Sequence, residues 1–123
     1  MKFYIVGSAL SKKAPRDIDM YGVMDEQLFE GVFGLTAERF QYWRRIEHTA
    51  PPNTYINPNF VKWQDHVLGA TRVLQFVYPG LVPLDFKFLP ESLLQEPNKE
   101  IDISTSPTSW GINLPKIGSH GVF

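Results

Sequence analysis

Two aspartates separated by a single residue are the feature of this sequence that points most clearly to chemistry. Asp17 and Asp19 lie in the segment DIDMYGVM, whose other residues are mostly apolar. Aspartate is depleted in β-strands, and side chains on a strand repeat with a period of two, so both carboxylates are expected on one face of a sheet. Two such groups repel unless a proton or cation lies between them. Mg²⁺ commonly binds one or two carboxylates together with water and substrate phosphates, so the pair predicts a divalent-cation site.

A second motif precedes the aspartates. Gly7 and Ser8 follow the apolar segment KFYIV, and Lys12 and Lys13 lie in the basic loop after them. Glycine lets a ligand approach the backbone closely, the serine hydroxyl can donate to a phosphate, and a helical turn beginning at Ser8 would add N–H groups that favour an anion. Together with the aspartates, this arrangement describes a site for a metal-bound triphosphate.

The elements that position these residues form an alternating series of strands and helices. Strands are predicted at residues 2–6, 17–23 and 84–88, and a fourth short strand in EIDIS, residues 100–104. Helices are predicted after Asp25, after Thr36 and from about residue 60 to 78, with Asn59 as the N-cap of the last. The expected fold is therefore α/β or α+β, with a mixed sheet of about four strands and helices packed on it.

Length and composition limit the alternatives. The chain has 123 residues, enough for one core and hence a single domain over residues 1–123. Its net charge of −1 argues against a dedicated binder of bulk nucleic acid, and it has no apolar run of transmembrane length, so no membrane partner is expected. The absence of cysteine excludes disulfides and thiolate metal sites and fits a cytoplasmic location.

The motifs together resemble the nucleotidyltransferase superfamily related to DNA polymerase beta, in particular its small stand-alone members, the minimal nucleotidyltransferases. The pattern is an apolar strand that ends in Gly-Ser, then a loop, then acid–apolar–acid–apolar on the next strand. Here it reads Val6-Gly7-Ser8 and Asp17-Ile18-Asp19-Met20. The match covers the first 24 residues and extends to a later carboxylate on a neighbouring strand.

Two residues compete for that third carboxylate. Asp85 lies in LDFKF, directly after the long helix, and Asp102 lies in EIDIS. Asp85 is preferred because its segment alternates for longer, with apolar residues at 84, 86 and 88 on the opposite face.

The resemblance implies transfer of a nucleoside monophosphate from a nucleoside triphosphate to an acceptor hydroxyl. Asp17, Asp19 and Asp85 would be the catalytic and metal-binding residues for two Mg²⁺ ions, or Mn²⁺ in their place. The nucleotide-binding residues would be Gly7, Ser8, Lys12 and Lys13. The sequence selects neither the nucleotide nor the acceptor: RNA, a protein and a small molecule all stay open, as does delivery of the acceptor by a partner protein or at a homodimer interface.

The alternative function is a non-catalytic module of the same fold that binds a nucleotide or a protein, for example in a toxin–antitoxin or phage–host setting. The short loop between Gly-Ser and the first aspartate and the long segment HTAPPNTYINPNF favour it. Arg44 and Arg45 stand near the end of a predicted helix, where positive charge is favourable in any case, and His48 has no partner at a metal-binding spacing.

Overall fold

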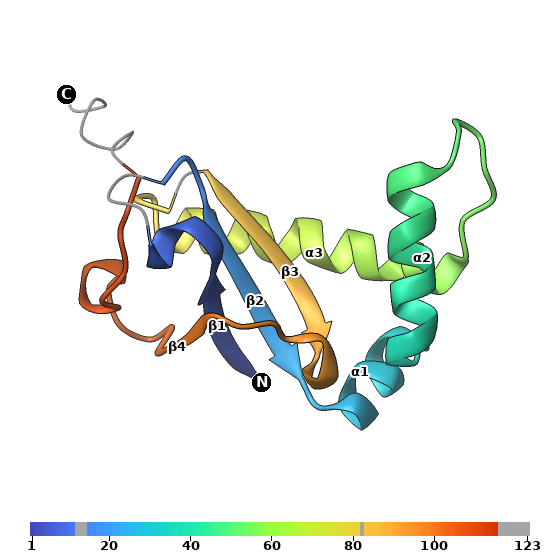
Figure 1. Cartoon of the computed structure of the whole chain (residues 1–123), viewed down its shortest axis with the longest axis horizontal. Helices are drawn as coiled ribbons and strands as arrows, with labels where there is room; N and C mark the ends of the chain where they lie inside the picture. Colours follow the sequence, from blue (N-terminus) through green and yellow to red (C-terminus); the bar gives the residue numbers. More distant parts are fainter. Residues whose placement is uncertain (12–14, 82, 116–123) are drawn as a thin grey trace.

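The computed structural model of the chain describes residues 1–11, 15–81 and 83–115. They form an α+β fold in which three helices pack against a four-stranded mixed sheet (Figure 1). The strands are β1 (Lys2–Val6), β2 (Ile18–Met24), β3 (Leu84–Pro90) and β4 (Asn98–Ile101). The predicted fold class is confirmed at this level.

The sheet has the strand order β3-β2-β1-β4. β1 is antiparallel to both β2 and β4, whereas β2 and β3 are parallel. A parallel pair requires a long crossover connection, and here all three α-helices lie in the chain between β2 and β3. The two strands that carry the predicted carboxylates are therefore neighbours at one edge of the sheet.

The helices are α1 (Glu26–Phe33), α2 (Ala37–Thr49) and α3 (Pro58–Val77). Asp25 and Thr36 cap the first two as predicted, each accepting a hydrogen bond from a backbone N–H of the first turn. α3 begins earlier than predicted: Asn57 is its N-cap and Pro58 its first residue. Proline is favoured at that position because its missing N–H would have no partner within the helix.

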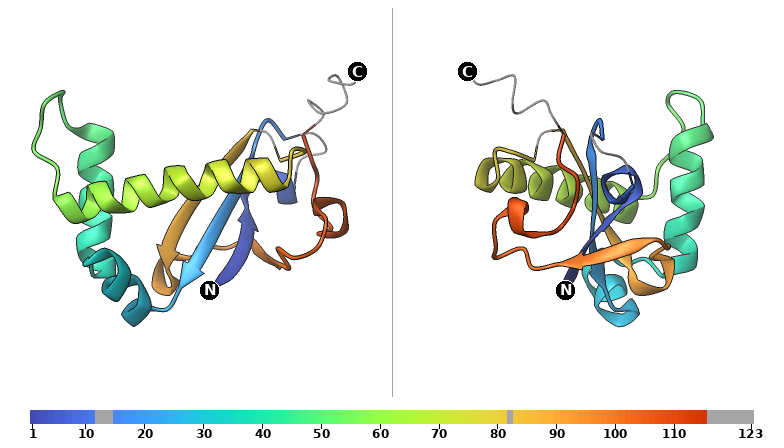
Figure 2. Two further views of the ribbon diagram at one scale, coloured as in Figure 1. Left: turned by 180° about the vertical axis from the view of Figure 1, so that it is seen from behind. Right: turned by 60° about the vertical axis from the view of Figure 1, so that its left-hand side comes forward.

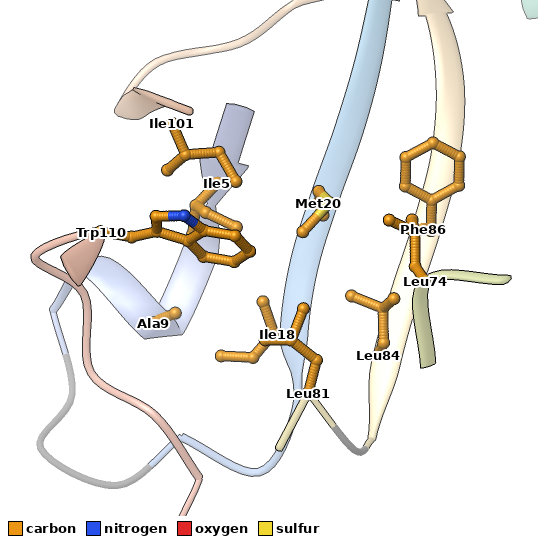
Figure 3. Close-up of a cluster of buried hydrophobic side chains, with 10 residues drawn as sticks. All are labelled: Ile5, Ala9, Ile18, Met20, Leu74, Leu81, Leu84, Phe86, Ile101 and Trp110. Atoms are coloured by element: carbon orange, nitrogen blue, oxygen red, sulfur yellow. The ribbon is translucent and has the colours of Figure 1, made fainter. Parts of the chain in front are cut away.

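Two clusters of buried side chains hold the helices on the sheet. The first lies under the N-terminal parts of β2 and β3 and includes Ile18, Met20, Leu84 and Phe86, with Leu74 of α3 (Figure 3). The second lies at the C-terminal ends of the same strands. It contains these residues: Met24, Phe29, Phe33, Leu35, Phe40, Phe60, Trp63 and Leu89.

The two clusters hold α2 and α3 at different positions relative to the sheet. α3 runs along one side of the sheet: in the left-hand view of Figure 2, which is seen from behind, it lies in front of the strands. The indole Nε1 of Trp63 donates to the carbonyl oxygen of Phe88 at 3.0 Å, which ties α3 to β3. α2 stands at the C-terminal ends of β2 and β3 (Figure 1), where its Phe40 packs in the second cluster.

Two element boundaries differ from the prediction. Asp17 lies in the bend directly before β2 instead of on the strand. The fourth strand ends at Ile101, so Asp102 lies just beyond it. Of the helices in the described ranges, none combines the length and hydrophobicity that crossing a bilayer requires.

Candidate functional site

Asp19 and Asp85 lie side by side on neighbouring parallel strands. They are register partners, between the buried pairs Ile18–Leu84 and Met20–Phe86. Because side chains alternate along both strands, the two carboxylates share the face opposite the first buried cluster. The next partners on that face are Tyr21 and Lys87.

Asp17 and Gly7 lie close to Asp19 at the N-terminal end of β2. Val6 is the register partner of Asp19 on β1, and Gly7 follows it with a φ of +73°. A Cβ on Gly7 would lie 2.7 Å from Oδ2 of Asp19, so this carboxylate occupies the space that a side chain at position 7 would need. Asp17 is close enough for its charge to act on Asp19.

The electrostatic environment of Asp19 opposes its ionisation. Partial burial raises the pKa of Asp19 above its ordinary value, and the negative charges of Asp17 and Asp85 raise it further, against a smaller opposite effect of Lys87. Raised pKa values of grouped carboxylates are typical of functional sites. A bound cation would remove this repulsion, so the pair Asp17 and Asp19 suits a divalent ion with carboxylate, water and phosphate ligands.

The third carboxylate is not assembled into a metal site. Asp85 forms an ion pair with Lys87, and half of its side chain, 52%, is exposed. Within the residues that the structure describes, no group of three or more His, Cys, Asp or Glu side chains could hold a metal ion together. In the described residues a cation would therefore have only Asp17 and Asp19 as carboxylate ligands, and a metal-binding role for these two residues and for Asp85 stays a prediction.

Asp102, the competing candidate, lies after β4 at the opposite edge of the sheet, with β1 between that strand and β2. Its Oδ1 accepts hydrogen bonds from the backbone N–H and the hydroxyl of Ser104, at 2.9 and 2.6 Å. These two bonds lower the pKa of Asp102. Asp102 therefore stabilises a turn, whereas Asp85 is the carboxylate that lies beside Asp19.

The predicted phosphate-binding residues are only partly described. Gly7 and Ser8 begin a single 3₁₀ turn, Gly7–Leu10, which is shorter than the helix that would concentrate N–H groups on an anion. The turn is fixed by a hydrogen bond from the N–H of Asn113 to the carbonyl oxygen of Ala9, at 2.9 Å. Lys12 and Lys13 lie outside the described residues.

A cleft of about 370 Å³, called the α2 cleft below, opens beside the three aspartates, on the side away from Gly7. It lies between α2 and the C-terminal parts of β2 and β3. Among the residues that line it are Tyr21, Gln41, Arg44, Arg45, His48 and Leu93. None of these residues belongs to the predicted site: Arg44 and Arg45 were attributed to the favourable effect of positive charge near a helix end. The two adjacent arginines were a signal in the sequence, but their proximity to β2 depends on how α2 packs.

Tyr21 connects the α2 cleft to the carboxylates. Its pKa is raised, first by burial, while Arg44 acts in the opposite direction and Asp19 and Asp85 add to the rise. The phenol is therefore neutral at physiological pH and lies within the electrostatic reach of both charged groups. The site thus has a negative part at Asp17, Asp19 and Asp85 and a positive part in the cleft.

Comparisons with protein-family models, with curated proteins and with solved structures found no match to this chain.

Proposed function

We propose that the chain transfers a nucleoside monophosphate from a nucleoside triphosphate to an acceptor hydroxyl, as the resemblance to the minimal nucleotidyltransferases implies. One observation carries the proposal: Asp85 is the register partner of Asp19 on an adjacent parallel strand and on the same face of the sheet. An acid–apolar–acid motif with a further carboxylate on the neighbouring strand is the arrangement that the family requires.

The arrangement of Gly7 and Asp19 supports the same function. The carboxylate of Asp19 lies in the space that a side chain at position 7 would need, so glycine keeps this space open. A triphosphate bound at Gly7 and Ser8 would therefore lie next to Asp19. Asp17 and Asp19 would hold Mg²⁺, which when bound neutralises phosphate charge and orients the triphosphate.

In the proposed reaction, the acceptor oxygen attacks the α-phosphorus of the nucleotide and forms a new P–O bond. The bond between that phosphorus and the oxygen bridging to the β-phosphate breaks, and pyrophosphate leaves with the electron pair. The acceptor proton passes to a base, and Asp85 is the carboxylate in position to take it. To do so, Asp85 must exchange its ion pair with Lys87 for a contact with the acceptor.

Calorimetry with ATP, GTP, CTP and UTP, each with and without Mg²⁺, tests this function. We expect one or more nucleotides to bind only with Mg²⁺ and Asp19→Asn to weaken that binding at least about tenfold, because metal ligands and their supports contribute effects of this size. Incubation of the same nucleotide labelled at the α-phosphate should then give labelled product and free pyrophosphate.

Asp65→Asn is the matched control, because it makes the same change of charge at an exposed position of α3. It should bind nucleotide as the wild type does. If no nucleotide binds to the wild type with or without Mg²⁺, the proposal is wrong.

A second candidate is the non-catalytic module that binds a nucleotide or a protein. It is favoured by the ion pair between Asp85 and Lys87 and by the lack of a three-ligand group among the described residues. This function predicts nucleotide binding that survives Asp85→Asn and no release of pyrophosphate with any acceptor.

A further inference from the structure

We propose that the α2 cleft binds the acceptor, and that the acceptor carries a phosphate beside its reacting hydroxyl, as a nucleotide or the 3′ end of an RNA strand does. This inference rests on the proposed function, because only a transfer reaction has an acceptor. The binding of a phosphate-bearing ligand in the cleft can nevertheless be measured without any reaction.

The first argument is position. Gly7, the expected contact of the triphosphate, lies at the N-terminal end of β2, because β1 is antiparallel to that strand. Tyr21, on the wall of the cleft, lies two residues beyond Asp19 in the other direction and on the same face. Two residues of strand span about 7 Å. The carboxylates therefore lie between the triphosphate site and the cleft, which suits an acceptor that approaches from the opposite side.

The second argument is charge. Three side chains that can carry positive charge line the cleft, namely Arg44, Arg45 and His48, and none of its described lining residues is acidic. Glu47 is nearby, at 3.6 Å from Nε of Arg44 and 3.9 Å from Nε2 of His48, and balances part of this charge. Arginine binds phosphate through two parallel N–H bonds, a geometry that lysine cannot reproduce.

The third argument is the state of Arg44. Its guanidinium lies over the rings of Phe40 and Trp63, with its carbon 5.9 and 5.4 Å from their centroids, so packing fixes its direction. Its Nε is buried without a hydrogen-bond partner in the described part of the chain. A buried donor in this state is uncommon in folded proteins, and a phosphate that replaced the ion pair with Glu47 would give it a partner.

The fourth argument is the volume of the α2 cleft and the uncharged residues that line it. A volume of about 370 Å³ falls in the range of roughly 300–1,000 Å³ that holds small ligands. Gln41, Gln95 and Thr49 offer neutral donors and acceptors, and Leu93 an apolar surface. Such a wall suits the ribose and base of one nucleotide beside a phosphate.

The test uses a fluorescein-labelled hexa-adenylate RNA, with its binding followed by anisotropy in EDTA and without nucleoside triphosphate. Arg45→Gln removes positive charge from an exposed position, so it should not alter the fold; equal melting temperatures check this. We expect Arg45→Gln to weaken binding roughly tenfold, the scale of one charge-assisted phosphate contact. Arg72→Gln, the same change at an exposed position of α3, should stay within about twofold of the wild type.

Unlabelled AMP distinguishes the two sources of the phosphate. Displacement by AMP as effective as that by unlabelled RNA identifies a mononucleotide acceptor, and displacement by RNA alone identifies a strand; both support the proposal. It is overturned if neither ligand binds, if Arg72→Gln weakens binding as much as Arg45→Gln, or if polyglutamate of equal charge displaces the RNA equally well, since the site would then bind acidic protein.

The result of the RNA-binding experiment can be distinguished from the result of the nucleotide-binding experiment that tests the proposed function. Loss of RNA binding with Mg²⁺-dependent nucleotide binding intact would overturn only the acceptor site. Arg45-dependent RNA binding without binding of any triphosphate would overturn the transfer reaction and leave a nucleic-acid-binding cleft.

Discussion

Oδ2 of Asp19 occupies the space where a side chain at position 7 would begin: a Cβ on Gly7 would lie 2.7 Å from it. The glycine also has a φ of +73°, which side chains rarely tolerate. The sequence motif Gly-Ser and the motif Asp-Ile-Asp thus meet at one point, on strands that are paired through Val6 and Asp19.

Gly7→Ala is expected to destabilise the fold by about 1–3 kcal/mol, because the positive φ and the close contact both oppose a Cβ. Urea unfolding measures the change. Gly69→Ala is the control, since nothing lies within 4 Å of a Cβ built on this residue of α3. It should stabilise by up to about 1 kcal/mol through helix propensity. A neutral effect of Gly7→Ala would contradict the contact.

Mg²⁺ or Mn²⁺ should raise the melting temperature, because a cation relieves the repulsion that raises the pKa of Asp19. At ten times the dissociation constant, the stabilisation is about 1.4 kcal/mol, or roughly 3–6 °C for a chain of this size. Asp19→Asn should remove the gain, and the control Asp65→Asn should keep it. Equal melting curves of the wild type with and without metal would count against the site.

The pH dependence of stability should carry the sign of the raised pKa of Asp19. The folded state then holds the proton more tightly than the unfolded state, so ionisation of Asp19 costs stability. This cost is absent below the ordinary pKa of 3.8 and grows as the pH rises from there through the folded-state value. The melting temperature of Asp19→Asn minus that of the wild type, measured in EDTA, should therefore increase over this window. A constant difference, or an NMR titration midpoint of Asp19 below 3.8, would show that the shift has the other sign.

Asp85→Asn and Asp102→Asn should differ in their effect on nucleotide incorporation. Asp85 lies beside Asp19, and Asp102 lies at the opposite edge of the sheet. We expect the first substitution to lower the rate at least about tenfold and the second to leave it unchanged. Asparagine at 102 keeps an oxygen that can accept from Ser104, so its fold should persist. A loss with Asp102→Asn alone would reverse the assignment of the third carboxylate.

The local features of the fold were readable in the sequence because they depend on near neighbours. A helix cap is a contact across three residues, and Asp25 and Thr36 were identified correctly. A run of β-branched and aromatic residues that ends at Gly7 indicated β1, and the alternation of apolar residues indicated β2 and β3. The cap of α3 was misassigned because two asparagines flank Pro58: Asn57 is the cap, and the side-chain amide of Asn59 donates instead to the carbonyl oxygen of Gly34, at 3.3 Å.

The pairing of distant segments was decided only by the tertiary structure. A strand pattern fixes which residues share a face, but the neighbour of that strand depends on the crossover that α1, α2 and α3 make. The register that sets Asp85 beside Asp19 therefore appears only in the folded sheet. The convergence of Tyr21 on β2 with Arg44 and Arg45 on α2 in one cleft has the same origin. These groups lie on elements far apart in the chain, and only packing of the two buried clusters brings them together.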